Sequence, residues 1–159
     1  GYGAGEIGHW TMWTVEKGER RRPVSLEDLI SEREIVERAQ ALAPEMLVGA
    51  PRPLEAIFFA VRNGDRMLRS LLDEVAYYTG IALANLIDVL NPQLVLLGGL
   101  LYEGYDLFES AIAETMRQFA FGGLGQDVEI RPATFGDESG EVGAAVLALD
   151  RFFYSNDAQ

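Results

Sequence analysis

The sequence predicts an α/β fold, and three observations lead to this prediction. From Asp65 to Leu90, apolar residues recur every three or four positions, as in a helix that packs against a core. Residues 94–97 form a continuous apolar run, which is typical of a strand covered on both faces of a parallel sheet. Helix and strand patterns alternate from there to the last helix. The alternation predicts parallel strands joined by right-handed crossovers.

The first part of the chain predicts a loop followed by short elements. Residues 1–13 begin with four glycines in eight positions, which is typical of a loop. Residues 11–16 alternate weakly, as in a short strand, and residues 17–23 are expected to form a polar loop. Ser25 and Ser31 each precede an acidic residue by three positions, which predicts two short helices that meet near Ser31. The residues of these helices expected to face the core are Leu26, Leu29, Ile30, Ile35, Val36, Ala39 and Leu42.

The middle of the chain predicts a loop, a short helix and then the long helix. Prolines and a glycine between residues 44 and 53 indicate a loop, and a helix over residues 54–62 is expected to end at Asn63-Gly64. Asn91-Pro92 should end the long helix, because proline cannot continue the helical hydrogen bonds. The apolar stripe of that helix comprises Leu68, Leu71, Leu72, Val75, Ala76, Ala82, Leu83, Leu86, Ile87 and Leu90.

Beyond residue 99, the pattern predicts a loop over residues 100–104 and a helix over residues 105–121 that ends at three glycines. Residues 128–133 alternate as in a strand near the sheet edge, because Pro132 lacks a donor. A closing helix is expected over residues 142–154. Two strands are few for a complete sheet, so part of the sheet is expected to lie outside this chain. The inward residues of the last two helices are expected to be Leu107, Phe108, Ala111, Ile112, Met116, Phe119, Val146, Leu149 and Phe153.

Composition excludes several classes of protein. The net charge of −12 and the pI near 4.4 argue against direct binding to a phosphate backbone, which requires clustered Lys and Arg. The chain has no cysteine, which excludes disulfides and cysteine-ligated zinc. No apolar run has the length of a membrane span, and the first residues do not resemble a signal peptide. We therefore expect a cytoplasmic protein without membrane partners.

Two groups of residues are candidates for a ligand site. Glu6 and His9 lie three positions apart in the glycine-rich loop, and a carboxylate beside an imidazole suits the recognition of hydroxyl groups. The alternative is that His9 is a structural hydrogen bonder and Glu6 is solvated. Gly98 and Gly99 follow the predicted strand, where open α/β sheets place their ligands, although a simple glycine turn is the competing interpretation. The chain has no Walker P-loop, no Ser-His-Asp order and no dinucleotide-binding glycine motif after a strand.

Five motifs occur in a characteristic order: GAGEIGHW, SLEDLISE, NGD, NPQLVLLGG and SGEVGAA. In this order and at these spacings the chain resembles the carboxyl-terminal half of the ROK family of bacterial sugar kinases and sugar-responsive transcriptional repressors. The resemblance implies part of the carboxyl-terminal lobe of an actin-like, hexokinase-like ATPase (ribonuclease H-like) fold, with sugar held between two lobes. It matches Glu6, His9 and Glu27 to sugar-contacting residues, and Gly98 and Gly99 to glycines beside the adenosine of ATP.

The chain also departs from the family pattern. His9 matches a ligand of the family's structural zinc, but the three cysteines expected between His9 and Leu26 are absent, so zinc is not expected. The phosphate loop and the catalytic Asp belong to an amino-terminal lobe that this chain does not contain, so no catalytic residue is assigned and no kinase turnover is expected of this segment. We expect residues 1–45 to hold the sugar-contacting loop with two short helices, and residues 46–159 to hold the remaining helices with two core strands.

The leading hypothesis is therefore the sugar-sensing portion of a ROK-type transcriptional regulator, which would contact DNA only through a domain outside this chain. The first alternative is a fragment of an ATP- and magnesium-dependent ROK kinase for a hexose or an N-acetylhexosamine. The second is an oligomerisation module without a ligand. A homo-oligomer is expected in each case, because an incomplete sheet leaves a strand edge and an apolar face uncovered.

Overall fold

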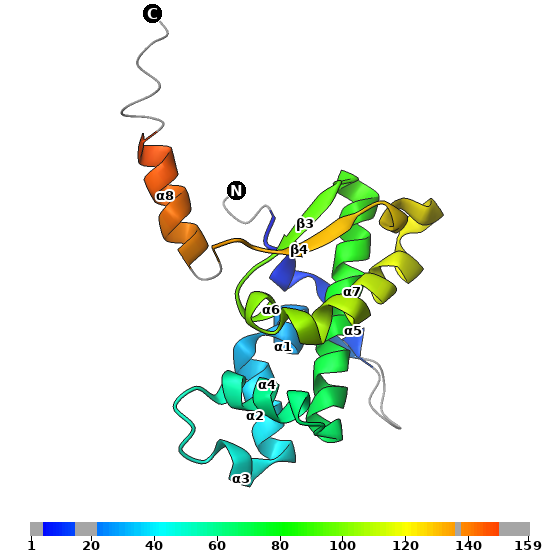
Figure 1. The fold of residues 1–159 in the computed structure, drawn as a ribbon. Helices are drawn as coiled ribbons and strands as arrows, with labels where there is room; N and C mark the ends of the chain where they lie inside the picture. The colour runs from blue at the N-terminus through cyan, green and yellow to red at the C-terminus, as the bar shows by residue number, and fades with distance from the viewer. Residues whose placement is uncertain (1–4, 15–21, 136–137, 150–159) are drawn as a thin grey trace, which may run out of the picture.

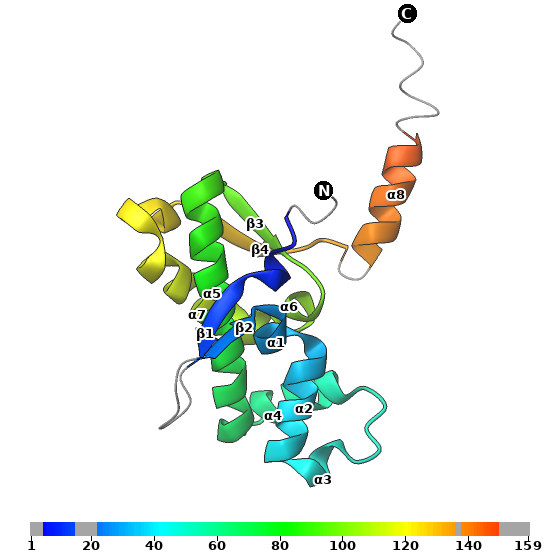
Figure 2. The ribbon, with the colours of Figure 1, turned by 180° about the vertical axis from the view of Figure 1, so that it is seen from behind.

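The structure is a computed structural model that describes residues 5–14, 22–135 and 138–149. Helices dominate it, and the strands within the described residues form two separate two-stranded sheets (Figures 1 and 2). The fold is thus of the predicted α/β type. In chain order the elements are η1 Ile7–His9, β1 Thr11–Thr14, β2 Arg22–Ser25, α1 Glu27–Ile30, α2 Glu32–Leu42, α3 Pro44–Leu47, α4 Pro53–Arg62, α5 Arg66–Leu90, β3 Leu94–Leu97, α6 Leu100–Glu103, α7 Tyr105–Phe119, η2 Phe121–Gln126, β4 Glu129–Pro132 and α8 Ser139–Leu149.

The long helix α5 begins and ends where the sequence predicts. Asp65 caps its amino terminus, since its Oδ1 accepts hydrogen bonds from the backbone N–H groups of Met67 (2.9 Å) and Leu68 (3.0 Å). At the other end Asn91 adopts the left-handed conformation (φ 45°, ψ 54°), and Pro92 follows. The helix therefore has a defined start at Asp65 and a defined end at Asn91.

Most of the predicted stripe of α5 is buried, with two exceptions: Leu86 is half-buried and Leu90 is exposed, so the inward assignment of Leu90 is wrong. Leu90 is the last residue of the helix, and no element among the described residues covers it. In contrast Thr79, Gly80 and Ala84 are buried outside the predicted stripe. The reason is that α5 packs against α7 as well as against α1, α2 and α4, so more than one of its faces is covered.

Helices α5 and α7 make the most extensive contact between any two described elements. They approach closely at Gly80, where an added Cβ would lie 2.6 Å from the Cβ of Thr115 and 3.0 Å from the carbonyl oxygen of Ile112. These distances are shorter than normal van der Waals contact distances. The close crossing of α5 and α7 therefore requires glycine at position 80, and Thr115 is buried against it.

Strands β3 and β4 pair in parallel, as predicted, with Leu94 opposite Glu129 and Leu97 opposite Pro132. The expectation that both faces of β3 are covered is wrong. Leu97 is buried and Val95 packs against the core, whereas Leu94 and Leu96 on the other face are exposed. The apolar core lies against only one face of this sheet, because the described residues contribute no layer to the other.

The glycine-rich loop leads into a hairpin that the sequence predicted only in part. β1 covers the described portion of the expected strand, and it pairs antiparallel with β2. The expected polar loop over residues 17–23 is wrong at its end, because Arg22 and Pro23 belong to β2; residues 15–21 lie outside the described part. Pro23 pairs with Trp13, and a two-stranded sheet accommodates it because each strand has a free edge.

Helices α1 and α2 meet at Ser31 as predicted. Ser25 and Asp28 exchange two hydrogen bonds, from the Ser25 N–H to Asp28 Oδ2 (3.1 Å) and from the Asp28 N–H to Ser25 Oγ (3.2 Å). The Ser31 hydroxyl accepts from the Glu34 N–H (3.4 Å). Leu42, at the end of α2, is exposed rather than buried.

Two predicted loops contain single-turn helices. Residues 44–47 form α3, which begins at Pro44, and proline is favoured in a first turn because its missing N–H would be unpaired there. Residues 100–103 form α6, which follows Gly99. Both corrections concern helices of four residues, too short to display a periodic apolar pattern.

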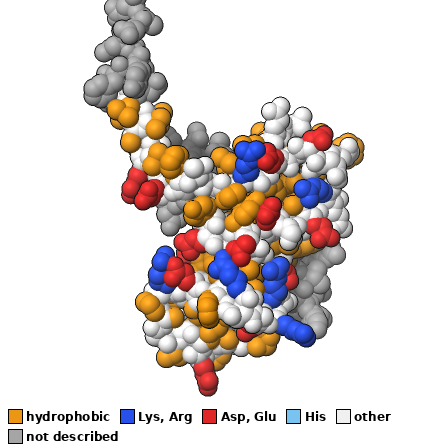
Figure 3. All heavy atoms as spheres, viewed as in Figure 1, with side chains coloured by type: hydrophobic (Ala, Val, Ile, Leu, Met, Phe, Trp, Pro, Cys, Tyr) orange, Lys and Arg blue, Asp and Glu red, His pale blue; other side chains and the backbone are white. Residues whose placement is uncertain are grey.

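The last helices differ from prediction in what they bury. α7 ends at Phe119, which is exposed, and a 3-10 segment with two left-handed glycines follows. α8 stands apart from the body, and Val146, Leu147 and Leu149 on it are exposed (Figures 1 and 3). Val146 and Leu149 therefore do not face a core as expected, and Phe153 lies outside the described residues. In the described part of the chain, no helix has both the length and the hydropathy to span a bilayer.

We expect Gly80→Ala to destabilise the intact protein. The added methyl group must push α7 away, and overpacking costs about 1–3 kcal/mol, against a gain of about 1 kcal/mol in helix propensity. Chemical denaturation followed by circular dichroism measures the net loss. Thr115→Gly should offset part of the loss in the double variant, because it removes the nearest clashing atoms.

The matched control is Gly143→Ala in α8, where an added Cβ meets nothing within 4 Å. This variant should keep or slightly raise the free energy of unfolding. A Gly80→Ala protein as stable as the control would contradict the close crossing of α5 and α7.

Candidate functional site

The loop that carries Glu6 and His9 is folded into a compact turn. Gly5 has a positive φ of 94°, and Ile7 to His9 form the 3-10 turn η1. The His9 N–H donates to the Glu6 carbonyl (3.2 Å), and the Trp10 N–H donates to the Ile7 carbonyl (2.9 Å). Glu6 and His9 therefore project from one short, hydrogen-bonded turn, and both side chains are exposed.

Glu27 comes from a different element but lies against the same turn. It is the first residue of α1, and an added Cβ on Gly8 would lie 3.6 Å from the Glu27 Cβ and 3.9 Å from its Oε2. The Leu26 N–H donates to the Trp10 carbonyl (2.8 Å), which ties the start of α1 to the end of the turn. The structure thus brings the Glu27 carboxylate to the backbone of the turn that holds Glu6 and His9.

The side chains of Glu6, His9 and Glu27 make no hydrogen bond or ion pair with any described residue. Their oxygens and ring nitrogens are free to bind an external partner. Two carboxylates accept hydrogen bonds only, whereas an imidazole accepts or donates according to its tautomer. Such a set suits a ligand with several hydroxyl groups.

Gly98 and Gly99 lie at the carboxyl end of β3, apart from this turn in the sequence. Gly99 has φ 57° and ψ −138°, a conformation that side chains disfavour, and its carbonyl accepts from the Tyr102 N–H (2.9 Å). Apart from Gly99 and its two chain neighbours, no atom of a described residue lies within 4 Å of an added Cβ at Gly99. The space beside this backbone is therefore open to a ligand.

A hollow of about 760 Å³ lies between α4, α6 and the loop that precedes α4. Phe59 and Tyr102 present aromatic surface to it, while Arg62 at its edge is held by Asp106 through two hydrogen bonds (2.9 and 2.6 Å). The Arg62 hydrogen bonds hold the pKa of the Asp106 carboxyl below its usual value. Sequence analysis did not single out these residues, because the pairing of Arg62 with Asp106 spans 44 positions.

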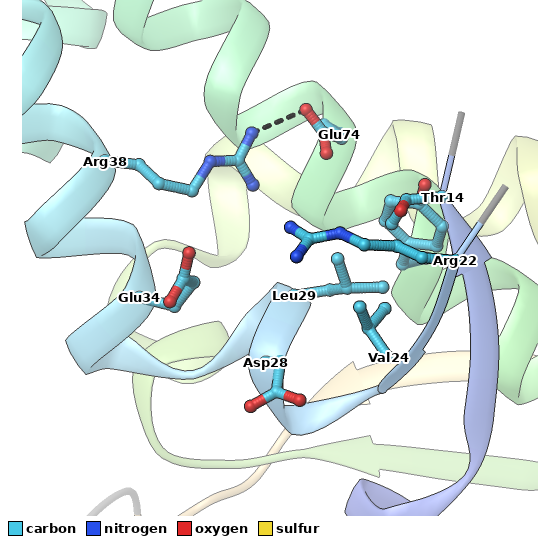
Figure 4. A pocket seen from close by; sticks show the side chains of 9 residues that line it. Thr14, Arg22, Val24, Asp28, Leu29, Glu34, Arg38 and Glu74 are labelled. Carbon is cyan, nitrogen blue, oxygen red and sulfur yellow. Dashed lines mark hydrogen bonds and ion pairs between the residues drawn. The ribbon is translucent and has the colours of Figure 1, made fainter. Parts of the chain in front are cut away.

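A second hollow, of about 560 Å³, lies between the hairpin and helices α1, α2 and α5 (Figure 4). Arg38 and Glu74 form an ion pair across it (2.6 Å), and hydrogen bonds from the side chain and backbone of Ser25 keep the pKa of Asp28 below its usual value. Burial, followed by the nearby Glu74 carboxylate, raises the pKa of Tyr78. The ion pair links α2 to α5, which gives this hollow a structural role.

Comparison with known proteins decides the family. A sequence model of the ROK family matches residues 1–151. The chain belongs to the ROK family. The resemblance expected from its motifs is therefore confirmed.

The relatives include both functional classes of ROK proteins. A glucokinase of Halalkalibacterium halodurans is 32% identical over 91 residues, which are 57% of this chain and 28% of that protein. The DNA-binding transcriptional repressor Mlc of Escherichia coli is 27% identical over 126 residues, which are 77% of this chain and 31% of the repressor. The chain thus spans under a third of the length of these two relatives.

Solved structures give the same fold. A ROK family glucokinase from Streptomyces griseus, in complex with glucose and AMPPNP, superposes with a TM-score of 0.69 at 26% identity. The match covers 91% of this chain and 51% of the glucokinase chain. The predicted membership in the fold of the ROK sugar kinases is confirmed.

The residues of this ROK chain do not fit the structural zinc that the family resemblance implies. All 159 residues lack cysteine, and His9 is the only histidine. Among residues 5–14, 22–135 and 138–149, no three His, Asp or Glu side chains gather in a way that could hold a metal ion. The hairpin is instead fastened by an apolar cluster whose buried members are Met12, Leu26, Leu29 and Ala82.

We expect chelator to leave the melting temperature of the intact protein unchanged, because packing and not metal holds the hairpin. Met12→Ala, by contrast, should cost about 2 kcal/mol or more, since it removes a buried side chain from that cluster. Thermal unfolding with and without EDTA, together with elemental analysis, tests this expectation. About one zinc per chain, lost with EDTA along with stability, would contradict it.

Proposed function

We propose that this chain is the sugar-sensing portion of a ROK-type transcriptional regulator, with Glu6, His9 and Glu27 forming one wall of the sugar pocket. The observation that supports the proposal is the close approach of the Glu27 side chain to Gly8, where an added Cβ would lie 3.6 Å from the Glu27 Cβ, in the turn of Glu6 and His9. These residues also match sugar-contacting positions in the family resemblance. Exposed carboxylates and an imidazole on the turn and on the adjoining start of α1 have the chemistry that hydroxyl groups require.

The charge of the chain supports a sensing rather than a DNA-contacting role. A net charge of −12 repels a phosphate backbone, so DNA binding would depend on a domain outside this chain. A sugar that binds one arrangement of the lobes of the intact protein more tightly than the other would raise the population of that arrangement. The affinity of the protein for DNA would change as a result. The similarity to a DNA-binding repressor over 77% of the chain is consistent with this class.

The second candidate function is an ATP-dependent sugar kinase, and one observation favours it. Tyr102 follows Gly99 by three positions and lines a hollow together with Phe59, and aromatic rings suit a purine. Gly98 and Gly99 would hold the adenosine of ATP there, and magnesium would accompany the phosphates. The catalytic base and phosphate-binding residues would have to come from polypeptide outside this chain.

Glu6→Ala and His9→Ala should each weaken sugar binding by about tenfold to a hundredfold, because a charge-assisted hydrogen bond contributes about 1.5–3 kcal/mol. Glu27→Gln should weaken it as well, since the amide keeps the shape but not the charge. Calorimetry of the intact protein with a panel of hexoses and N-acetylhexosamines measures these affinities. His9→Ala should remain folded, because His9 is exposed and belongs to no cluster of potential metal ligands among the described residues.

Glu32→Ala is the matched control, because Glu32 is also an exposed carboxylate, in the first turn of α2. It should bind sugar as the wild type does. Unchanged affinity in folded Glu6→Ala and His9→Ala proteins would overturn the pocket assignment and favour an oligomerisation module without a ligand.

A separate experiment decides between regulator and kinase. The intact protein is expected to change its affinity for its operator DNA when sugar is added, and to show no ATP-dependent phosphorylation of the same sugar in a coupled assay. Phosphorylation of the sugar with no effect on DNA would contradict the regulator and establish the kinase.

A further inference from the structure

A pair of reciprocal hydrogen bonds encloses Glu27 at the start of α1. The Ser25 N–H donates to Asp28 Oδ2 (3.1 Å), and the Asp28 N–H donates to Ser25 Oγ (3.2 Å). Leu26, which lies between them in the chain, already has helical dihedral angles (φ −58°, ψ −39°), so these bonds close around the first helical turn. Glu27 therefore belongs to a segment whose two ends, Ser25 and Asp28, are bonded to each other.

The helix α1 is too short to maintain its conformation unaided. It comprises only the four residues Glu27–Ile30, and a single helical turn fixes several dihedral angles in return for few hydrogen bonds. The first N–H groups of a helix have no partner within it, and the Ser25 hydroxyl accepts from one of them. The Ser25–Asp28 pair thus stabilises the backbone from which the Glu27 side chain projects.

Ser25 also connects α1 to the turn that carries the other candidate sugar-binding residues. As the last residue of β2 it pairs with Thr11 of β1, and the next residue, Leu26, donates its N–H to the Trp10 carbonyl (2.8 Å). Within the described ranges no cluster of side chains could hold a metal ion at this corner. Hydrogen bonds and packing therefore set the position of α1 relative to the turn.

We propose that Asp28 is a positioning residue for the sugar site, and that its hydrogen bonds with Ser25 hold the Glu27 carboxylate beside Gly8. This inference rests on the proposed function, because it requires that Glu27 binds sugar. The direction of a helical side chain is set by its backbone, and Glu27 Oε2 lies 3.9 Å from an added Cβ on Gly8. Without the Ser25–Asp28 bonds the first turn frays, and the Glu27 carboxylate leaves this position.

Calorimetry of the intact protein tests the proposal, with the tightest-binding member of a panel of hexoses and N-acetylhexosamines as the probe. Asp28→Ala should raise the dissociation constant about threefold to tenfold, because it removes a helix cap rather than a sugar contact. Ser25→Ala should raise it as well. Asp28→Asn should bind within about twofold of the wild type, since the amide oxygen accepts from the Ser25 N–H as the carboxylate does.

A double variant separates positioning from a general loss of stability. If Asp28 acts through Glu27, Asp28→Ala should change the affinity by less than about twofold in a protein that already carries Glu27→Ala. Asp65→Ala is the matched control, because it also removes a carboxylate that caps a helix, at the start of α5. It should lower the melting temperature and leave the sugar affinity unchanged.

Wild-type affinity in Asp28→Ala and Ser25→Ala proteins, with weaker binding by Glu27→Gln, would overturn this inference and leave the proposed function standing. An Asp28→Ala effect of the same size with and without the Glu27 side chain would also overturn it. Wild-type affinity in Glu27→Gln, or a wild type that binds no sugar of the panel, would overturn the proposed function and this inference together. Thermal unfolding shows that each variant is folded.

Discussion

The packing of α5 against α7 at Gly80 is the contact on which the rest of the structure depends. At this point the Thr115 side chain occupies the space that any side chain at position 80 would need. The close approach buries the facing stripes of both helices in one core, and the β3–β4 sheet attaches to that core through Leu97 of β3 and through Val128, which directly precedes β4. The β3–β4 sheet and the Gly98-Gly99 turn are therefore positioned through this pair of helices.

The opposite side of α5 carries the candidate sugar site. Tyr78, Ile81 and Ala82 of α5 contribute to the apolar cluster that holds the hairpin and α1. Burial of a side chain such as Leu26 contributes about 1.5–3 kcal/mol. The hydrogen bond from Leu26 to the Trp10 carbonyl contributes only about 0.5–1.5 kcal/mol. Packing therefore supplies most of the attachment, while the hydrogen bond fixes the register of the turn against α1.

Much of the helical framework could be predicted from the sequence, because its signals are local. α5 has an apolar period, a capping Asp65 and the Asn91-Pro92 stop, and its predicted bounds agree with the structure to within one residue. The single-turn helices α3 and α6 and the strand β2 were not predicted, since four residues display no period and Pro23 obscures a strand. The exposure of Leu90, Leu96 and Phe119 could not be predicted either, because an apolar pattern shows which residues require burial but not what covers them.

The candidate site, like the fold, could be predicted only where its signals are local in the sequence. The spacing of Glu6 and His9 in one loop is a local signal, whereas the approach of Glu27 to Gly8 depends on the hairpin between them. The ion pair of Arg38 with Glu74 connects positions 36 apart, and composition gives no indication of it. Contacts between distant segments are set by tertiary packing, so sequence patterns alone did not reveal them.

A crystal structure of the intact protein with the sugar that most raises its melting temperature tests the account most directly. The account predicts sugar hydroxyls within hydrogen-bond distance of the Glu6, His9 and Glu27 side chains, with the turn still seated on α1. A sugar bound elsewhere, with these three side chains facing solvent, would contradict it.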